Sequence, residues 1–258
     1  MMNALINCRF NVNVHENMKP SSIAILTGAG ISAESGLPTF RASDGLWCDH
    51  RIEDVATPEA FGRNPKLVHQ FYNMRRAQLK DVQPNAAHLV LADLAAQWDG
   101  KLFIITQNVD DLHERAEVGK NLKPGYTLLH MHGELRKARC TASDEIFAWE
   151  DDMTLETLCP CCKTAGRLRP HIVWFNEMPL HMELIDHILS ECDLFMSIGT
   201  SGNVYPAAQF VRQVRMHGKA HTVELNMEPS LGHSAFHEKI YGPATQVVPE
   251  YVKRILKA

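Results

Sequence analysis

The chain has 258 residues, 45% of them apolar, and a formal net charge of −4 at pH 7. This size and composition predict one large domain, or a large domain with a small appendage. The mildly acidic balance gives no electrostatic reason to expect nucleic acid or an anionic membrane as partner. The N-terminal segment is polar, and an apolar run of about 18 residues is absent from the sequence, so we expect a cytoplasmic protein.

Apolar runs of strand length alternate with helical patterns along the chain. Strands are predicted at 23–27, 102–106, 194–198, 221–225 and 245–248. Helices are predicted at 85–98, 182–191, 206–217 and 249–257. Strands that alternate with helices indicate a parallel sheet covered on both faces. The predicted fold class is therefore α/β, with a Rossmann-like, doubly wound parallel sheet.

Two segments lie outside this alternation. Residues 57–80 show a helical pattern, and residues 136–179 are irregular and contain four of the seven cysteines. We expect them to form a smaller inserted lobe, with a helical part and a zinc-ribbon-like part. The predicted division is a large lobe of about 20–47, 84–134 and 180–258, and a small lobe of about 48–83 and 135–179. Because open α/β sheets bind ligands beyond the carboxyl ends of their strands, the crevice should lie between this lobe and the sheet.

A glycine motif follows the first predicted strand directly. Gly28, Gly30 and Ala33 match the dinucleotide fingerprint, in which glycines let the backbone approach a pyrophosphate closely. The fingerprint also requires an acidic residue at the end of a second strand, about 20 positions on. Residues 38–47 instead have the composition of a loop. The motif predicts a dinucleotide site and disfavours an ordinary hydride-transfer dehydrogenase.

Polar clusters follow three further predicted strands, at 107–113, at 199–203 and at Asn226. Spacing alone favours helix capping by Asn108 or Asp110 as the explanation of the first cluster. Four polar strand ends on one edge nevertheless favour one extended ligand across the sheet. His132 is one of 14 histidines, so by itself it is more simply a surface or core residue than a general base. The adjacent Gly133 would let a ligand come close.

Five ordered motifs together resemble the sirtuin family of NAD-dependent protein deacylases, over about residues 23–256. They are Gly28-Ala29-Gly30-Ile31-Ser32, Gly36-Leu37-Pro38-Thr39-Phe40-Arg41, Thr106-Gln107-Asn108-Val109-Asp110, His132-Gly133-Glu134 and Gly199-Thr200-Ser201. The resemblance implies a lysine deacylase that consumes NAD and yields nicotinamide, O-acyl-ADP-ribose and free lysine. Its partners would be acylated lysines of proteins or peptides, with no nucleic acid and no membrane.

The same resemblance assigns residues to the reaction and to NAD. It implies that His132 is the base that deprotonates a ribose hydroxyl, with Asn108 and Asp110 as further catalytic residues. The NAD-binding residues that it implies are Gly28, Ala29, Gly30, Ser32, Ala33, Glu34, Thr39, Phe40, Arg41, Trp47, Gln107, Asn108, Val109, Asp110, Gly199, Thr200, Ser201, Asn226, Met227 and Ala244.

Tyr72 and Arg75 are three residues apart in a helical pattern, hence on one face. Spacing alone favours a core tyrosine and an arginine that covers apolar surface. The pair resembles the acyl-pocket signature of the sirtuin class, class III, that accepts acidic acyl groups such as succinyl or malonyl. A guanidinium can bind a carboxylate with two hydrogen bonds, and a phenol can add a third. We expect removal of both acetyl and succinyl or malonyl groups.

The segment 172–179 resembles the family segment along which the substrate peptide lies as an added strand. The substrate-binding residues expected there are Val173, Trp174 and Phe175. The family usually has glycine where this chain has Asn176. Because backbone pairing tolerates many side chains, peptide preference should be broad.

The cysteines depart from the usual pattern of two Cys-x-x-Cys pairs. Ser143 stands three residues after Cys140, whereas Cys159-Pro160-Cys161-Cys162 retains one pair. The expected ligands of a structural zinc ion are Cys140, Cys159 and Cys162, with Cys161 or a water molecule as fourth ligand. Cys8, Cys48 and Cys192 are interpreted as free thiols.

Two alternative functions remain beside the deacylase. A protein ADP-ribosyltransferase would release nicotinamide without needing an acylated substrate. A zinc-ribbon module that binds nucleic acid is disfavoured by the acidic balance and by the single short cysteine cluster.

Overall fold

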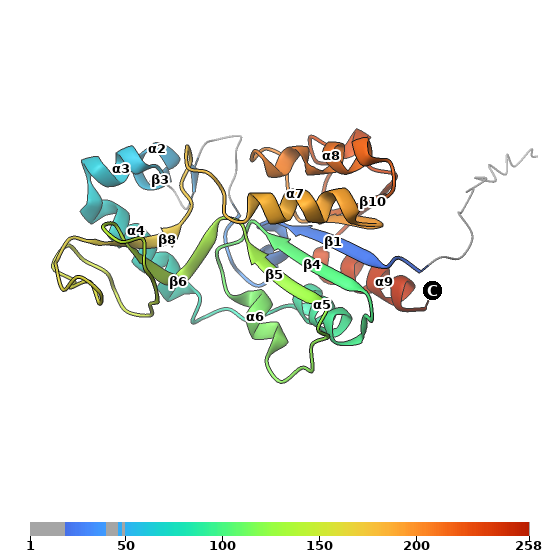
Figure 1. Ribbon diagram of the computed structural model, residues 1–258, viewed down its shortest axis with the longest axis horizontal. Coiled ribbons are helices and arrows are strands. Elements are labelled where there is room, and N and C mark those ends of the chain that lie inside the picture. Colours follow the sequence, from blue (N-terminus) through green and yellow to red (C-terminus); the bar gives the residue numbers. More distant parts are fainter. Residues whose placement is uncertain (1–18, 40–45, 48–49, 258) are drawn as a thin grey trace, which may run out of the picture.

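The computed structural model describes residues 19–39, 46–47 and 50–257 (Figure 1). Its main sheet has six strands in the order β11, β10, β9, β1, β4, β5, and each neighbouring pair is parallel. The strands are β1 (Ser22–Thr27), β4 (Lys101–Thr106), β5 (Tyr126–His130), β9 (Leu194–Ile198), β10 (His221–Asn226) and β11 (Glu238–Tyr241). The predicted doubly wound α/β fold is confirmed.

Helices cover both faces of this sheet (Figure 1). Helices α5 (Ala86–Gln97) and α9 (Ala244–Lys257) pack on one face, with α6 (Leu112–Glu117) beside α5. Helices α7 (Met182–Glu191) and α8 (Phe210–His217) pack on the other face. Every residue of β1 is buried, because its alternating side chains enter the two apolar cores on opposite faces. The uninterrupted apolar run of this strand follows from its central position.

The last predicted strand is wrong. Residues 245–248 begin helix α9, and Pro249 lies inside that helix. The buried residues Val247, Val248, Tyr251, Val252 and Ile255 recur at helical spacing and pack against the sheet and α5. This packing outweighs the local preference of proline to begin a helix. The edge strand is β11, which the sequence pattern did not indicate.

A smaller lobe lies at the end of the sheet where the β1 and β4 arrows point (Figure 1). It contains the helices α2 (Ile52–Val55), α3 (Pro58–Arg63) and α4 (Pro65–Gln78) and the antiparallel sheet β7 (Ile146–Ala148), β6 (Gly133–Cys140), β8 (Leu168–Ile172). A short hairpin joins β2 (Leu46–Trp47) to β3 (His50–Arg51). Two further apolar clusters lie here: one is within the smaller lobe, and the other also includes Leu37 and Leu112 of the larger lobe. We propose the predicted lobe boundaries as the division of the chain.

Three short helices complete the described elements: α1 (Gly30–Ala33), η1 (Ala207–Gln209) and η2 (His233–Ala235). From β1 the chain builds the sheet through β4 to β5, then crosses to β9 on the other side of β1 and continues to β11. The direction of strand order therefore reverses between β1 and β9. Such a reversal opens a crevice at the carboxyl ends of the two strands. In the described part of the chain, the helices all lack the length and apolar character that crossing a bilayer would require.

Candidate active site

A crevice of about 560 Å³ opens at this reversal point and extends between the sheet and the smaller lobe. Residues that follow β1, β4, β9 and β10 line its sheet side. Tyr72, Arg75 and Trp174 line its small-lobe side. The four polar strand ends expected from the sequence are thus brought to one ligand-sized cavity.

Most of the sequence-predicted site residues line this crevice. They are Gly28, Ala29, Gly30, Ser32, Thr39, Trp47, Tyr72, Arg75, Gln107, Asn108, Val109, Asp110, His132, Val173, Trp174, Phe175, Gly199, Thr200, Ser201, Asn226 and Met227. Ala33, Glu34 and Ala244 do not line it. Phe40 and Arg41 lie outside the described residues.

Glu34 makes contacts away from the crevice. Its carboxylate accepts hydrogen bonds from the Thr245 backbone N–H at 2.9 Å and from the Thr245 hydroxyl at 2.7 Å. It therefore holds the first turn of α9, where a negative charge is also favourable. Ala244 packs against the sheet core nearby. A role of these two residues in NAD binding stays a prediction.

The glycines at the reversal point bring two loops into backbone contact. The Gly30 N–H donates to the Gly199 carbonyl at 2.7 Å. A Cβ atom on Gly30 would lie 2.7 Å from Gly199, and one on Gly199 would lie 2.3 Å from the Ile31 nitrogen. Gly199 also has φ +64°, in the left-handed region. These positions need glycine because the backbones of the loops after β1 and β9 are in contact. This contact alone requires glycine there, whether or not a ligand is bound.

A buried polar network lies under the middle of the crevice. The Asn85 N–H donates to His88 Nδ1 at 3.4 Å, so Nε2 carries the ring hydrogen and faces the Ser32 hydroxyl at 3.4 Å. Ser32 Oγ accepts from Asn108 Nδ2 at 3.1 Å and donates to Asp110 Oδ2 at 3.0 Å. Burial lowers the pKa of His88 to about 4 and raises the pKa of Asp110. A neutral histidine thus fixes Ser32, and Ser32 orients both predicted catalytic side chains.

Further hydrogen bonds connect the strand ends to one another. Gln107 Nε2 donates to Thr200 Oγ1 at 3.1 Å, and Asn226 Nδ2 donates to the Thr200 carbonyl at 2.9 Å. These contacts join the loops after β4, β9 and β10. The floor of the crevice is preorganised as one unit.

His132 lines the crevice, and one of its ring nitrogens is hydrogen-bonded to the backbone. Its Nδ1 lies 3.2 Å from the Gln107 carbonyl oxygen, which can only accept, so Nδ1 carries the hydrogen. Nε2 is then the basic nitrogen. Burial lowers the pKa of His132, and the Gln107 hydrogen bond opposes this only in part. Gly133 follows with φ +81°, and a Cβ there would lie 2.1 Å from the His171 carbonyl oxygen. The ring can therefore act as a neutral base at pH 7.

Tyr72 and Arg75 are buried on helix α4 at the small-lobe end of the crevice. Trp174 Nε1 donates to Tyr72 Oη at 3.0 Å, so Tyr72 retains its own O–H as a donor. Burial raises the pKa of Tyr72, which keeps the phenol protonated. The Arg75 guanidinium lies over the Trp47 ring, 5.2 Å from its centroid, and donates to Gln78 Oε1 at 2.9 Å. A cation and a neutral donor thus face the same apolar pocket.

The segment 173–176, which follows β8, is hydrogen-bonded to both lobes. The Val173 N–H donates to the His132 carbonyl at 2.9 Å, and the Phe175 N–H donates to the Ala56 carbonyl at 2.9 Å. Asn176 has φ +72°, a left-handed conformation that glycine adopts freely and asparagine tolerates. The expected exchange of glycine for asparagine therefore preserves the backbone. This segment runs along the crevice beside the predicted base.

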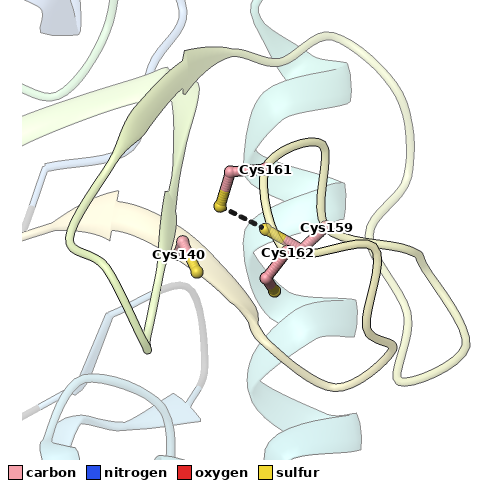
Figure 2. A group of neighbouring side chains, drawn as sticks. All are labelled: Cys140, Cys159, Cys161 and Cys162. Atoms are coloured by element: carbon pink, nitrogen blue, oxygen red, sulfur yellow. Dashed lines mark hydrogen bonds between the residues drawn. The ribbon is translucent and has the colours of Figure 1, made fainter.

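The four cysteine sulfurs of the smaller lobe lie within 4.8 Å of one another (Figure 2). Cys140 ends β6, and Cys159, Cys161 and Cys162 come from one loop. Hydrogen bonds from Ser143 and from the Ala142 N–H lower the pKa of Cys140 to about 6, so its thiolate forms readily. Four converging sulfurs are the donor set of a structural zinc site. Cys161 thus lies with the three predicted ligands, as one of the two predicted choices of fourth ligand. Of the three cysteines interpreted as free thiols, Cys192 is a buried free cysteine, and Cys8 and Cys48 lie outside the described residues.

Sequence reasoning missed some residues of the site. Tyr205, Glu228 and Leu231 line the crevice from loops after β9 and β10. Leu231 lies five residues after Asn226, in the loop that follows β10, so its position just beyond a strand end is the only sequence signal for it. His88 lies in the predicted helix 85–98, and the sequence pattern assigned it no role in the site. Its role depends on a contact with Ser32, 56 residues away, which no local pattern reveals.

A doubly wound sheet with a glycine-rich crevice at its reversal point, and with a buried histidine on the wall of that crevice, is typical of enzymes of the dinucleotide-binding class. The family model described as "Sir2 family" matches residues 28–206. The chain therefore belongs to the Sir2 family, the sirtuins.

Curated relatives are named NAD-dependent protein deacylase. One from Salmonella typhimurium is 56% identical over 95% of this chain and 87% of its own length. One from Escherichia coli K12 is 56% identical over 95% of this chain and 85% of its own length.

Solved structures are similar as well. A Sir2 homologue in complex with NAD has a TM-score of 0.80 and 36% identity, covering 93% of this chain and 91% of that chain. A complex of Sir2 with a p53 peptide and NAD+ has a TM-score of 0.72 and 25% identity, covering 93% of both chains.

Proposed function

We propose that this protein is an NAD-dependent protein lysine deacylase that removes acetyl and succinyl or malonyl groups. The observation that carries the proposal is the position of His132. Its ring lines the same crevice as the polar strand ends that would hold a dinucleotide and as the buried pair Tyr72 and Arg75. The relatives' names support NAD as co-substrate and acylated protein as substrate.

Different residues of the crevice would bind NAD, orient it and transfer the proton. Loops after β1, β9 and β10 would hold the dinucleotide, and Ser32, Asn108 and Asp110 would orient its nicotinamide end. When bound, NAD supplies the ADP-ribosyl group that accepts the acyl group. His132 Nε2 takes a proton from a ribose hydroxyl, and the Gln107 carbonyl stabilises the ring as its other nitrogen keeps its hydrogen. Trp174 and Phe175 line the same crevice.

Acyl selectivity would come from the pocket on α4. An acidic acyl group presents a carboxylate that Arg75 can pair with and that Tyr72 can hydrogen-bond. An acetyl group offers no such carboxylate, yet it fits the same space. We therefore propose both activities in one site.

Comparison of Arg75→Met on matched succinyl-lysine and acetyl-lysine peptides tests this selectivity. Loss of a charged hydrogen bond costs about 1.5–3 kcal/mol, so kcat/KM for desuccinylation should fall by roughly tenfold to 150-fold. Deacetylation should change far less. Arg63→Met, on exposed α3, is the matched control and should alter neither rate. Equal losses on both peptides in the Arg75 variant would exclude the proposed role.

A further inference from the structure

A second histidine, His130, contacts the loop that contains the predicted catalytic residues Asn108 and Asp110. His130 ends β5, two residues before His132. His132 Nδ1 lies 3.2 Å from the Gln107 carbonyl oxygen, and His130 Nδ1 lies 3.2 Å from the next carbonyl oxygen, that of Asn108. Two rings from one strand end thus hold two consecutive peptide groups.

The other side of the His130 ring faces a carboxylate. Nε2 lies 2.7 Å from Glu114 Oε1 on α6, and the His130 side chain is only 9% exposed. A carbonyl oxygen and a carboxylate oxygen both accept hydrogen bonds, whereas a neutral imidazole has one N–H. Only the imidazolium form satisfies both partners. The geometry therefore requires a cationic ring, in contrast to the neutral ring of His132.

We propose that His130 and Glu114 form a positioning pair that holds the Asn108 peptide in the orientation needed for nicotinamide release. This inference rests on the proposed NAD-dependent function. The Asn108 side chain donates to Ser32, so a shift of its peptide would disturb the contact between Ser32 and Asp110. His130 itself lies beneath the crevice and is a positioning residue.

The surroundings of His130 favour the charged ring. Burial alone would lower the pKa of His130, but the Glu114 hydrogen bond and its charge outweigh burial and raise it. Burial alone would likewise raise the pKa of Glu114, and the His130 hydrogen bond reverses this. The titratable groups that interact with His130 are Asp110 of the loop, His113, Glu114 and Glu117 of α6, and Glu134 of β6. Lys137 of β6 acts on Glu114. As pH rises through its raised pKa, His130 loses one of its two hydrogen bonds.

Two variants remove the pair from opposite sides, His130→Gln and Glu114→Gln. Each should lower kcat for nicotinamide release by about tenfold, with little change in KM for the acylated peptide. The double variant should be no slower than either single variant, because each removes the same interaction. The proposal predicts that kcat of the native enzyme falls at alkaline pH as His130 loses its proton, and this fall should be absent from all three variants.

Glu117→Gln is the matched control. It removes a negative charge from the same helix, but its carboxylate accepts from the Tyr126 hydroxyl and not from His130. It should keep the native kcat and the native alkaline fall. All rates are measured at a temperature at which circular dichroism shows each variant to be folded. If His130→Gln does not fold, the kcat and pH profile of Glu114→Gln alone test the positioning role.

Variants that unfold at lower temperature yet keep the native kcat and pH profile would overturn the proposal, because the pair would then be purely structural. Additive losses in the double variant would overturn it too. If the native enzyme itself releases no nicotinamide from NAD and an acylated peptide, the proposed function fails first. Native activity with unaffected variants refutes the positioning role alone.

Discussion

Two histidines near the end of β5 have opposite charge preferences because of the atoms that their rings face. His132 has one acceptor, the Gln107 carbonyl, and stays neutral in its buried position. His130 has two acceptors, a carbonyl and the Glu114 carboxylate, and gains a proton. The ring that is neutral has a free lone pair for base catalysis. The ring that is charged holds the loop.

Replacement of His132 by alanine tests its role as base. General base catalysis is typically worth about a hundredfold to ten-thousandfold, so His132→Ala should reduce deacylation by that amount while the protein stays folded. Mass spectrometry of the peptide product measures the rate, and circular dichroism checks the fold. Unchanged turnover would remove His132 from the mechanism.

The pH dependence gives a second test of the same residue. Because the pKa of His132 is lowered by burial, most of the rings are still neutral at pH 6.5, so kcat should stay high there and fall at more acidic pH. A pH series of kcat with saturating NAD and peptide measures the acidic limb. An apparent pKa above 6.5 on that limb would contradict the burial of the ring.

At the residue scale the sequence predicted most crevice residues, because strand ends and glycines mark them locally. Glu34 shows the limit of this reasoning. Its neighbours in the motif line the crevice, but its own carboxylate reaches Thr245, 211 positions away, and holds α9. Such a contact depends on how two elements pack, which no single motif encodes.

At the scale of elements, the contact between the loops after β1 and β9 determines the shape of the crevice. Gly199→Ala should lower the free energy of unfolding by about 3 kcal/mol or more, since the new Cβ meets the Ile31 backbone and the residue has φ +64°. Gly218→Ala is the matched control. It has φ +75° with no atom within 4 Å of the added Cβ, so only about 1 kcal/mol of backbone strain is expected. Urea denaturation of both variants measures the difference, and equal losses would refute the importance of the loop contact.

The cysteine cluster gives a second test at this scale. The purified protein should contain one zinc ion per chain, and Cys159→Ser should lose zinc and lower the midpoint of thermal unfolding. Cys192→Ser, at a buried cysteine outside the cluster, should keep the metal. Metal analysis by mass spectrometry measures both. Substoichiometric zinc in a folded, active native sample would show that the cluster holds no structural ion.

The elements themselves were predicted unequally. Helix 182–191 and the strands 23–27 and 102–106 agree with the structure nearly to the residue, because their apolar periodicity is long and unbroken. Residues 245–248 were misassigned because two valines followed by proline are typical of a strand that ends where a helix begins. Only the packing of Val247 and Val248 against α5 and the sheet reveals the longer helix.

At the scale of the whole molecule, buried neutral histidines couple stability to pH. Burial lowers the pKa values of His69, His88 and His171 to about 4. In the unfolded chain these side chains titrate near 6.5, so the unfolded state binds more protons between pH 6.5 and 4. The contribution of these three rings to stability is complete above pH 6.5 and falls as pH decreases through this range. His130 has a raised pKa and acts in a different window: its contribution is complete below pH 6.5 and is lost as pH rises through the raised pKa.

Urea denaturation at pH 7 and at pH 5 measures this coupling. The free energy of unfolding should be lower at pH 5, by on the order of a few kcal/mol in total. His69→Leu, which replaces a ring whose two nitrogens have no hydrogen-bond partner among the described residues, should reduce the difference. Equal stability at the two pH values would contradict the neutral state of these rings.

The overall arrangement was predictable, since alternating strands and helices imply a doubly wound sheet and ligands sit at its reversal point. The sequence also indicated that segments 57–80 and 136–179 leave the sheet. It did not show that Tyr72 meets Trp174, 102 positions away, or that four sulfurs converge in the smaller lobe. These contacts arise when two distant segments pack around separate apolar clusters.

The stoichiometry of the products distinguishes NAD-dependent deacylation from its alternatives. The native enzyme is incubated with NAD and a succinyl-lysine or acetyl-lysine peptide, and nicotinamide, free lysine peptide and O-acyl-ADP-ribose are quantified together by mass spectrometry. NAD-dependent deacylation should give equal amounts of all three, and none of them without NAD. Loss of the acyl group without release of nicotinamide would contradict it, as would nicotinamide release with ADP-ribose attached to a peptide that keeps its acyl group.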